Sequence, residues 1–258
     1  PTVEVSRLQL CATPVCGTPR GIRHQCACHG PILPRVSLLW EVPVSHEQRP
    51  TIAGTRPDAV RICEVSPRDG LQNEAVIVST DDKVELIEQL VAAGLKDVEV
   101  TSFVRPAWVP QLADAAEVIA RLPQQDDVRF WSLVPNRRGL ERAIGSGVRH
   151  VATFMSVSET HNKKNLNRTR RESLSGLDDV IATAKAEHMT VRAYLSTVFG
   201  CPFEGPVAVD ETVRLSLALL EAGADELALG DTTGMGNPVL VTKVVEGLVA
   251  AGVHLDQI

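Results

Sequence analysis

The sequence predicts an α/β fold of the TIM (βα)8-barrel type, in an incomplete form with about six strand–helix units. Short β-type runs alternate with helical segments along most of the chain, which is typical of a parallel sheet. The joint between a helix and the next strand also recurs, as Ala93-Gly94-Leu95, Ser146-Gly147-Val148, Ala222-Gly223-Ala224 and Ala251-Gly252-Val253. This repetition indicates one structural unit that is used several times.

The predicted elements follow in order from Val60. Strands are expected at 60–65, 97–103, 128–134, 150–157, 191–198 and Glu226–Leu229. Helices are expected at 79–94 and near 111–122, 136–146, 170–187, 208–222 and 238–251. A seventh strand would begin near Ile258, so we expect a barrel truncated before its seventh strand.

The helix at 79–94 illustrates how these assignments are made. Ser79 can cap its start, and two aspartates follow in the first turn, where negative charge favours the helix dipole. Val84, Ile87 and Leu90 lie on one apolar face, and Gly94 supplies the stop.

Composition excludes several classes of protein. The chain has 258 residues, of which 44% are hydrophobic and 22% charged, and this is typical of a globular protein. A formal net charge of −6 argues against a nucleic-acid or anionic-membrane partner. No apolar run approaches the length of about 18 residues that a membrane-spanning helix needs.

The first 59 residues differ from the rest. They contain eight of the 16 prolines and four of the six cysteines, and they show no sustained period. We therefore expect residues 1–59 to be an irregular leader, disordered or non-native, and residues 60–258 to be the barrel domain. The cluster His24-x-Cys26-x-Cys28-His29 is an alternative site for a soft metal, although its spacing fits no zinc-finger pattern. The leader also lacks the features of a signal or transit peptide, which favours the cytoplasm over the mitochondrial matrix.

Polar residues collect where the predicted strands end. They are Arg68, Asp69, Glu99, Thr101, Ser102, Asn136, Ser156, Ser158, Tyr194, Ser196, Asp231 and Thr232. The carboxyl ends of the strands carry the chemistry in TIM barrels, so we expect one shared site. The alternatives are helix capping for Asp231 and Thr232, and a surface turn for Arg68-Asp69.

The charged members of this set predict carbonyl chemistry. Asp69, Glu99 and Asp231 would converge on one face and repel one another, and a divalent cation would relieve this while polarising a substrate oxygen. Arg68 would add a fixed cation that can stabilise a developing enolate. The residues alone therefore predict metal-assisted carbonyl chemistry.

Several segments resemble the 3-hydroxy-3-methylglutaryl-CoA lyase family. They are EVSPRDGLQNE at 64–74, TSFV at 101–104 with WVPQ at 108–111, KKNLN at 163–167, GCPFEG at 200–205 and LGDT at 229–232. The Arg-Asp-Gly-x-Gln turn alone would indicate only the wider superfamily of Claisen-type synthases, aldolases and carboxyltransferases, also called DRE-TIM metallolyases. The continuation after that turn and the TSFV block favour the lyase.

The resemblance implies an activity and a set of roles. The activity is a retro-Claisen cleavage of 3-hydroxy-3-methylglutaryl-CoA to acetyl-CoA and acetoacetate, a step of leucine degradation, in a homodimer that uses Mg²⁺ or Mn²⁺. The implied catalytic residues are Arg68, Glu99 and Asp231, the metal ligand is Asp69, and the substrate-binding residues are Arg68, Gln72, Asn165, Tyr194 and Thr232. The family's two metal-binding histidines, its asparagine ligand and its catalytic cysteine have no counterpart in this chain.

Two alternatives to the lyase stay open. One is a related Claisen-type acyltransferase or aldolase of the same superfamily. The other is a truncated, non-catalytic protein that keeps a CoA-binding half-site. Tyr194 has its own alternative, as half-buried packing inside the barrel.

Overall fold

The computed structural model describes residues 60–123 and 125–258. The expected leader at 1–59 and its His24–His29 cluster lie outside these residues, and no observation tests the boundary at 59/60. In the described part of the chain, no helix is both long and apolar enough to cross a membrane.

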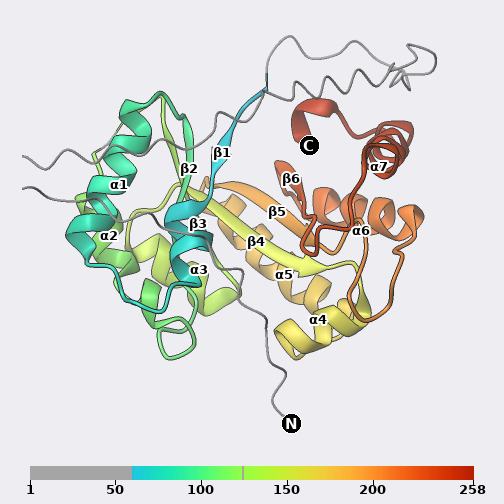
Figure 1. The fold of residues 1–258 in the computed structure, drawn as a ribbon, viewed down its shortest axis with the longest axis horizontal. Coiled ribbons are helices and arrows are strands. Elements are labelled where there is room, and N and C mark those ends of the chain that lie inside the picture. Colours follow the sequence, from blue (N-terminus) through green and yellow to red (C-terminus); the bar gives the residue numbers. More distant parts are fainter. Residues whose placement is uncertain (1–59, 124) are drawn as a thin grey trace, which may run out of the picture. The chain divides into compact units, whose positions relative to one another are not determined.

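Six parallel strands form one sheet in the order β1-β2-β3-β4-β5-β6 (Figure 1). They are β1 Cys63–Glu64, β2 Asp97–Ser102, β3 Arg129–Leu133, β4 His150–Ser156, β5 Thr190–Ser196 and β6 Glu226–Leu229. Each strand pairs with the next strand along the chain, so every crossover moves in the same direction, as in a TIM barrel and unlike a doubly wound sheet.

The helices connect the strands and surround the sheet in chain order (Figure 1). They are α1 Thr80–Ala92, α2 Ala115–Arg121, α3 Arg137–Gly145, α4 Glu159–Leu166, α5 Arg170–Ala186, α6 Val209–Glu221 and α7 Pro238–Ala250. A π-helical turn, η1 (Ser66–Gly70), follows β1, and two 3₁₀ turns occur as η2 (Pro110–Leu112) and η3 (Leu255–Gln257).

The sheet is strongly curled. Neighbouring strands lie about 4.8 Å apart, so a flat sheet would separate β1 from β5 by about 19 Å. Yet Arg192 Nη1 on β5 lies 2.8 Å from Cys63 Sγ on β1, and Tyr194 Oη lies 2.7 Å from Glu99 Oε2 on β2. The side chains on the inner face therefore meet across a concave surface, which confirms the predicted incomplete TIM-type barrel.

The hydrophobic core lies between the outer face of the sheet and the helices. Its larger cluster is centred on β4, β5 and helices α3, α5 and α6, with residues such as Leu140, Val151, Ile181 and Leu215. A smaller cluster joins α1 and α2 to β2 and includes Ile87. The inner face of the sheet carries charged side chains, including Glu99, Arg192 and Glu226, together with the ring of Trp131.

Most predicted elements are found to within one or two residues. Local signals explain why, because Ser79 Oγ caps α1 by accepting from the Asp82 N–H, and Gly94 follows the helix with φ of 102°. Thr169 and Glu172 form a capping box at the start of α5.

Three expectations were wrong. Strand β1 covers only Cys63–Glu64 rather than 60–65, because Val60 and Ile62 are exposed and only two residues pair with β2. The expected helix at 111–122 is broken into η2 and α2. Helix α4 was not expected, because it has no apolar stripe and Asn162 is its only buried residue. The sequence features that mark its two ends are Ser158, which is the N-cap, and Asn167, which takes the left-handed conformation with φ of 54° at the C-cap.

Candidate active site

The centre of the site is an ion pair between two strands. Arg68 lies in the turn η1 directly after β1, and its Nε donates to Oε1 of Glu99 on β2. Glu99 is fully buried and the Arg68 side chain is 12% exposed. The guanidinium is thus held at the carboxyl end of the strands, with part of it facing solvent.

The second oxygen of Glu99 is also occupied. Tyr194 on β5 donates its hydroxyl to Glu99 Oε2 at 2.7 Å. Burial, reinforced by the Glu99 charge, raises the pKa of Tyr194 far above its ordinary value, so its proton stays in place as the donor. Each oxygen of Glu99 therefore accepts one hydrogen bond within the protein, and the carboxylate holds the Arg68 guanidinium in a fixed position.

Asp69 occupies the rim of the site. Its side chain is 53% exposed, and its Oδ1 accepts from Arg68 Nη1 at 2.5 Å. The turn that carries it is closed by the Asp69 N–H donating to the Val65 carbonyl, and Asn73 Nδ2 donates to the Asp69 carbonyl. The turn therefore presents Asp69 outward beside Arg68.

Asp231 and Thr232 lie after β6 and order the loops around the mouth of the site, that is, the open end of the curled sheet at the carboxyl ends of its strands. Asp231 Oδ1 accepts the N–H groups of Met235 and Gly236 at 3.0 and 3.1 Å, and Thr232 Oγ1 accepts the Thr197 N–H at 2.9 Å. Helix α7 is capped by Asn237 rather than by Asp231. Capping of α7 therefore does not explain Asp231, and its exposed carboxylate faces solvent at the loop.

The other predicted substrate-binding residues lie further from this centre. Gln72 is half-buried just after η1, and Asn165 is exposed on α4. Helix α4 is docked onto the loop that follows β5, because Lys164 Nζ lies 4.1 Å from the centre of the Phe203 ring and Glu204 Oε1 accepts the Thr160 N–H. Asn165 is thus carried on an anchored helix beside two exposed lysines.

A serine–histidine pair at the end of β4 was missed by the sequence reasoning. Ser156 Oγ lies 2.6 Å from His161 Nδ1, and burial lowers the pKa of His161, which favours the neutral imidazole. Ser158 Oγ caps α4 and accepts from Cys201 Sγ at 2.9 Å. In the sequence, the pair could have been indicated only by the alternation of β4, which sets the direction of Ser156, and by the five-residue spacing to His161. Because α4, which carries His161, was not expected, the pair was not predicted.

A second charged layer, also missed, lies beneath the first. Arg192 on β5 donates to Glu226 Oε2 from Nη2 at 2.7 Å, and Arg129 pairs with both Glu226 and Asp97. The guanidinium of Arg192 also packs 4.1 Å from the centre of the Trp131 ring. Burial opposes ionisation of Glu226, but hydrogen bonds from Arg192, Arg61 and Arg129 overcome it and lower its pKa from 4.5 to about 2.

The described residues do not form a metal site. Within residues 60–123 and 125–258, no group of three His, Cys, Asp or Glu side chains is placed to hold a cation. Asp69 is half-exposed at the rim and could supply one of the six or more oxygens that hard divalent cations take.

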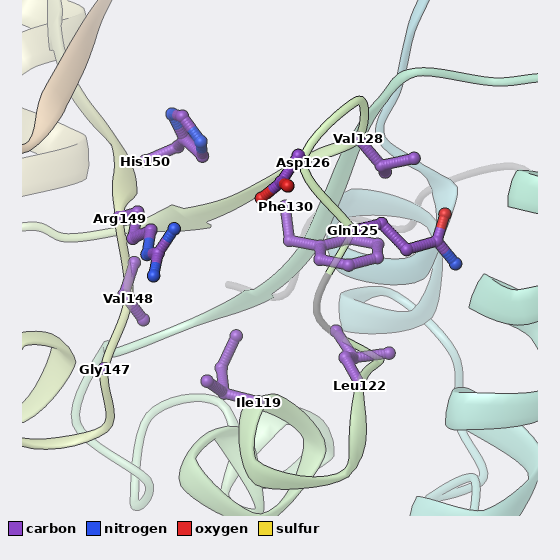
Figure 2. A pocket seen from close by; sticks show the side chains of 10 residues that line it. All are labelled: Ile119, Leu122, Gln125, Asp126, Val128, Phe130, Gly147, Val148, Arg149 and His150. Carbon is purple, nitrogen blue, oxygen red and sulfur yellow. The ribbon is translucent and has the colours of Figure 1, made fainter.

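The pocket drawn in Figure 2 lies elsewhere. Its lining includes Val128, Val148 and His150, which belong to the amino ends of β3 and β4. Arg68, Asp231 and Thr232 all follow the carboxyl ends of their strands. The candidate site and this pocket are therefore at opposite ends of the sheet.

Comparison with known proteins gives consistent matches. The family model described as HMGL-like matches residues 59–256. A hydroxymethylglutaryl-CoA lyase of Bacillus subtilis is 50% identical over 75% of this chain and 65% of its own length. The cytoplasmic 3-hydroxy-3-methylglutaryl-CoA lyase of Rattus norvegicus is 44% identical over 74% of this chain and 56% of its own length. The chain thus spans between about half and two thirds of these relatives.

Solved structures agree with this result. The crystal structure of the Bacillus subtilis HMG-CoA lyase superposes with a TM-score of 0.73 at 50% identity, over 75% of this chain and 65% of that one. An HMG-CoA lyase from Acinetobacter baumannii, in complex with coenzyme A and 3-methylmalate, gives 0.72 at 35% identity, over 76% of this chain and 64% of that one.

Proposed function

The chain belongs to the HMGL-like family, and from that premise we propose that it serves the cleavage of 3-hydroxy-3-methylglutaryl-CoA to acetyl-CoA and acetoacetate. The observation that carries the proposal is the guanidinium of Arg68, which Glu99 holds at the mouth of the curled sheet. A fixed cation at this position is what the cleavage of a carbon–carbon bond next to a thioester needs, because the negative charge develops on the thioester oxygen.

The reaction requires a base, a group that stabilises the enolate oxygen and a source of a proton. A base removes the proton of the tertiary hydroxyl, and the oxygen forms the ketone of acetoacetate as the carbon–carbon bond breaks. The electron pair of that bond passes to the thioester as an enolate, and a proton added at its carbon gives acetyl-CoA. Arg68 would hydrogen-bond the enolate oxygen through its solvent-facing part, while its Nε stays on Glu99.

We assign the surrounding residues by their geometry. Glu99 and Tyr194 act as positioning residues, since Glu99 accepts from Arg68 Nε with one oxygen and from the Tyr194 hydroxyl with the other. Asp231 is the carboxylate placed to bind the substrate hydroxyl, with its loop ordered around it. Asn165 on α4, beside exposed Lys163 and Lys164, would contact the phosphates of the CoA arm. Gln72 and Thr232 complete the acyl pocket in this proposal.

The proposed cofactor is Mg²⁺ or Mn²⁺, with Asp69 as a ligand. Asp69 is supported by its exposure at the rim, and by oxygen being the ligand atom that these cations prefer. Its test is binding of Mn²⁺, followed by electron paramagnetic resonance, to the chain and to Asp69→Asn. Loss of a bound Mn²⁺ signal in the variant supports the assignment, and equal binding by both proteins contradicts it.

A second candidate function is a non-catalytic CoA-binding protein. It is favoured by one observation, namely that the described residues gather no set of metal ligands. A related Claisen-type acyltransferase or aldolase remains the alternative within the superfamily, and it would require a 2-oxo acid as a reactant.

One assay separates these functions. The purified 258-residue chain is incubated with 3-hydroxy-3-methylglutaryl-CoA and Mg²⁺ or Mn²⁺, and acetoacetate is measured, while CoA binding is measured by calorimetry. Release of acetoacetate without an added 2-oxo acid supports the lyase. Binding of CoA without turnover supports the non-catalytic function, and turnover only with a 2-oxo acid supports the alternative enzyme.

We also propose a cytoplasmic homodimer. Relatives are named both as cytoplasmic and as mitochondrial forms, so the names alone do not decide the compartment. Light scattering after size-exclusion chromatography tests the dimer, and fractionation of cells that express the protein tests the compartment.

A further inference from the structure

A pocket of about 110 Å³ opens at the amino ends of β3 and β4 (Figure 2). It is bounded by α2, by the loop that leads into β3 and by the loop that leads into β4. No residue of the candidate active site lines it, so whatever it binds is independent of the proposed lyase function.

One half of the pocket is apolar. Figure 2 shows Ile119 and Leu122 beneath the ring of Phe130, with Val148 on the opposite side. A cavity of about 150 Å³ is the size that takes a benzene ring in a protein core. This pocket is smaller, so it suits an aliphatic group of about four carbons better than an aromatic ring.

The other half carries two charges of opposite sign. Arg149 and Asp126 both line the pocket and are exposed, and neither forms a salt bridge with another described residue. Their neighbours behave differently, because Lys96 and Asp127 pair with each other at 2.5 Å. The pocket therefore presents one cation and one anion that the described protein does not neutralise.

His150 lines the pocket, but its buried ring nitrogen Nδ1 is not accessible to a ligand. Its Nδ1 is buried and has no hydrogen-bond partner among the described residues, and its ring is held beside Trp131 with 5.3 Å between the ring centres. Burial and the nearby charge of Arg129 lower the pKa of His150, so the ring is neutral near pH 7 and donates from one nitrogen. The ring is held against Trp131 and lies near Arg129, so it is turned away from Arg149 and from the apolar half of the pocket.

We propose that this pocket binds a free aliphatic α-amino acid as its zwitterion. Its carboxylate would pair with Arg149, and its ammonium would face Asp126. Its branched side chain of three or four carbons would lie on the apolar half. A simple anion would be repelled by Asp126, and a simple cation by Arg149, so the two charges together select a molecule that carries both.

Calorimetry with the full 258-residue chain tests the class of ligand. L-leucine, L-valine, L-phenylalanine and glycine are the probes. Leucine or valine is expected to bind at least tenfold more tightly than glycine, which has no side chain for the apolar half, and more tightly than phenylalanine, whose ring is too large. Absence of binding by all four, or equal binding of leucine and glycine, overturns the proposal.

Variants then test the location. Arg149→Gln and Asp126→Asn are each expected to weaken leucine binding at least tenfold, and both residues are exposed, so the melting temperature should not change. Matched controls are Arg138→Gln and Asp178→Asn, which are exposed and make no salt bridge among the described residues, and which should bind leucine normally.

Leucine analogues that lack one of the two charges test which charge contacts Asp126 and which contacts Arg149. With 4-methylpentanoate, which lacks the ammonium, Asp126→Asn should bind at least as tightly as the parent chain. With 3-methylbutylamine, which lacks the carboxylate, Arg149→Gln should likewise lose nothing. Leucine binding that is unchanged in both variants would place the ligand elsewhere and overturn the proposal.

Discussion

Two layers of buried charge lie on the inner face of the curled sheet, and they differ in how completely their charges are paired. In the upper layer, at the carboxyl ends of the strands, Arg68 contacts Glu99 and Asp69 and still faces solvent in part. In the lower layer, two residues earlier along β2 and β5, Asp97 and Glu226 are surrounded by Arg129 and Arg192.

The difference concerns what each layer can still bind. Arg192 is occupied by Glu226, by the Cys63 sulfur and by the face of Trp131, so it has no direction left for a ligand. Arg68 has a solvent-facing part, and its neighbour Asp69 is half-exposed. The same residue types therefore produce two different layers. In the lower layer every side of the Arg192 guanidinium contacts protein, which suits a structural role. In the upper layer the Arg68 guanidinium keeps a side open to solvent, which suits binding of a substrate.

The largest expected effect is on the lower layer. Arg192→Met removes a buried cation and leaves Glu226 and Asp97 with less compensation, so the free energy of unfolding should fall by about 3–5 kcal/mol. Urea unfolding measures it, with exposed Arg171→Met as the matched control, for which a change within about 0.5 kcal/mol is expected. A loss below about 1 kcal/mol for Arg192→Met would show that the layer is less tightly coupled than its distances indicate.

Arg68→Gln should affect chemistry more than stability. If the proposed lyase function holds, kcat should fall about 100- to 1,000-fold, because the fixed cation near the enolate oxygen is lost. The free energy of unfolding should fall by less than for Arg192→Met, since Tyr194 still hydrogen-bonds Glu99. Acetoacetate release and CoA binding are measured together, and a kcat that does not change would remove Arg68 from the mechanism.

The low pKa of Glu226 predicts a dependence of stability on pH. The folded-state pKa is about 2 and the ordinary value is 4.5, so the contribution is present above about pH 4.5 and is lost as the pH falls toward 2. Allowing for solvent screening, this contribution is about 2 kcal/mol. Between pH 7 and pH 3, the parent chain should therefore lose more stability than Glu226→Gln. Equal losses in both proteins would contradict the assignment.

A loss of stability similar to that from protonation of Glu226 is expected for Tyr194→Phe. The variant keeps the ring and removes one hydrogen bond to a buried carboxylate, which costs about 1–3 kcal/mol of stability. If Tyr194 only positions Glu99, kcat should fall while the affinity for CoA stays constant. A rise in KM with an unchanged kcat would instead make Tyr194 a substrate-binding residue, as the sequence resemblance implies.

Short-range patterns were sufficient for most elements. The caps at Ser79 and Thr169 and the glycine at Gly94 act within one helical turn, so the helix ends were visible in the sequence. Helix α4 was not visible in this way, because its stability depends on contacts with the loop after β5, such as that of Lys164 with Phe203.

The candidate site was predicted residue by residue but not as an arrangement. The positions of Arg68 and Asp231 directly after their strands could be predicted, since the carboxyl ends of parallel strands meet at one edge, and Glu99 lies within β2. The hydrogen bond from Tyr194 to Glu99 could not, because it joins residues 95 positions apart across the curled sheet.

The sequence by itself determined the order of strands and helices, the parallel sheet and the family resemblance, since all three depend on local periodicity and contiguous motifs. Only the tertiary structure decided which charges are saturated. Arg68 follows a strand and Arg192 belongs to one, and no local pattern in the sequence separates them. The curl of the sheet surrounds Arg192 with Glu226, Cys63 and Trp131. Pairing across the sheet depends on that curvature, and no local pattern encodes it.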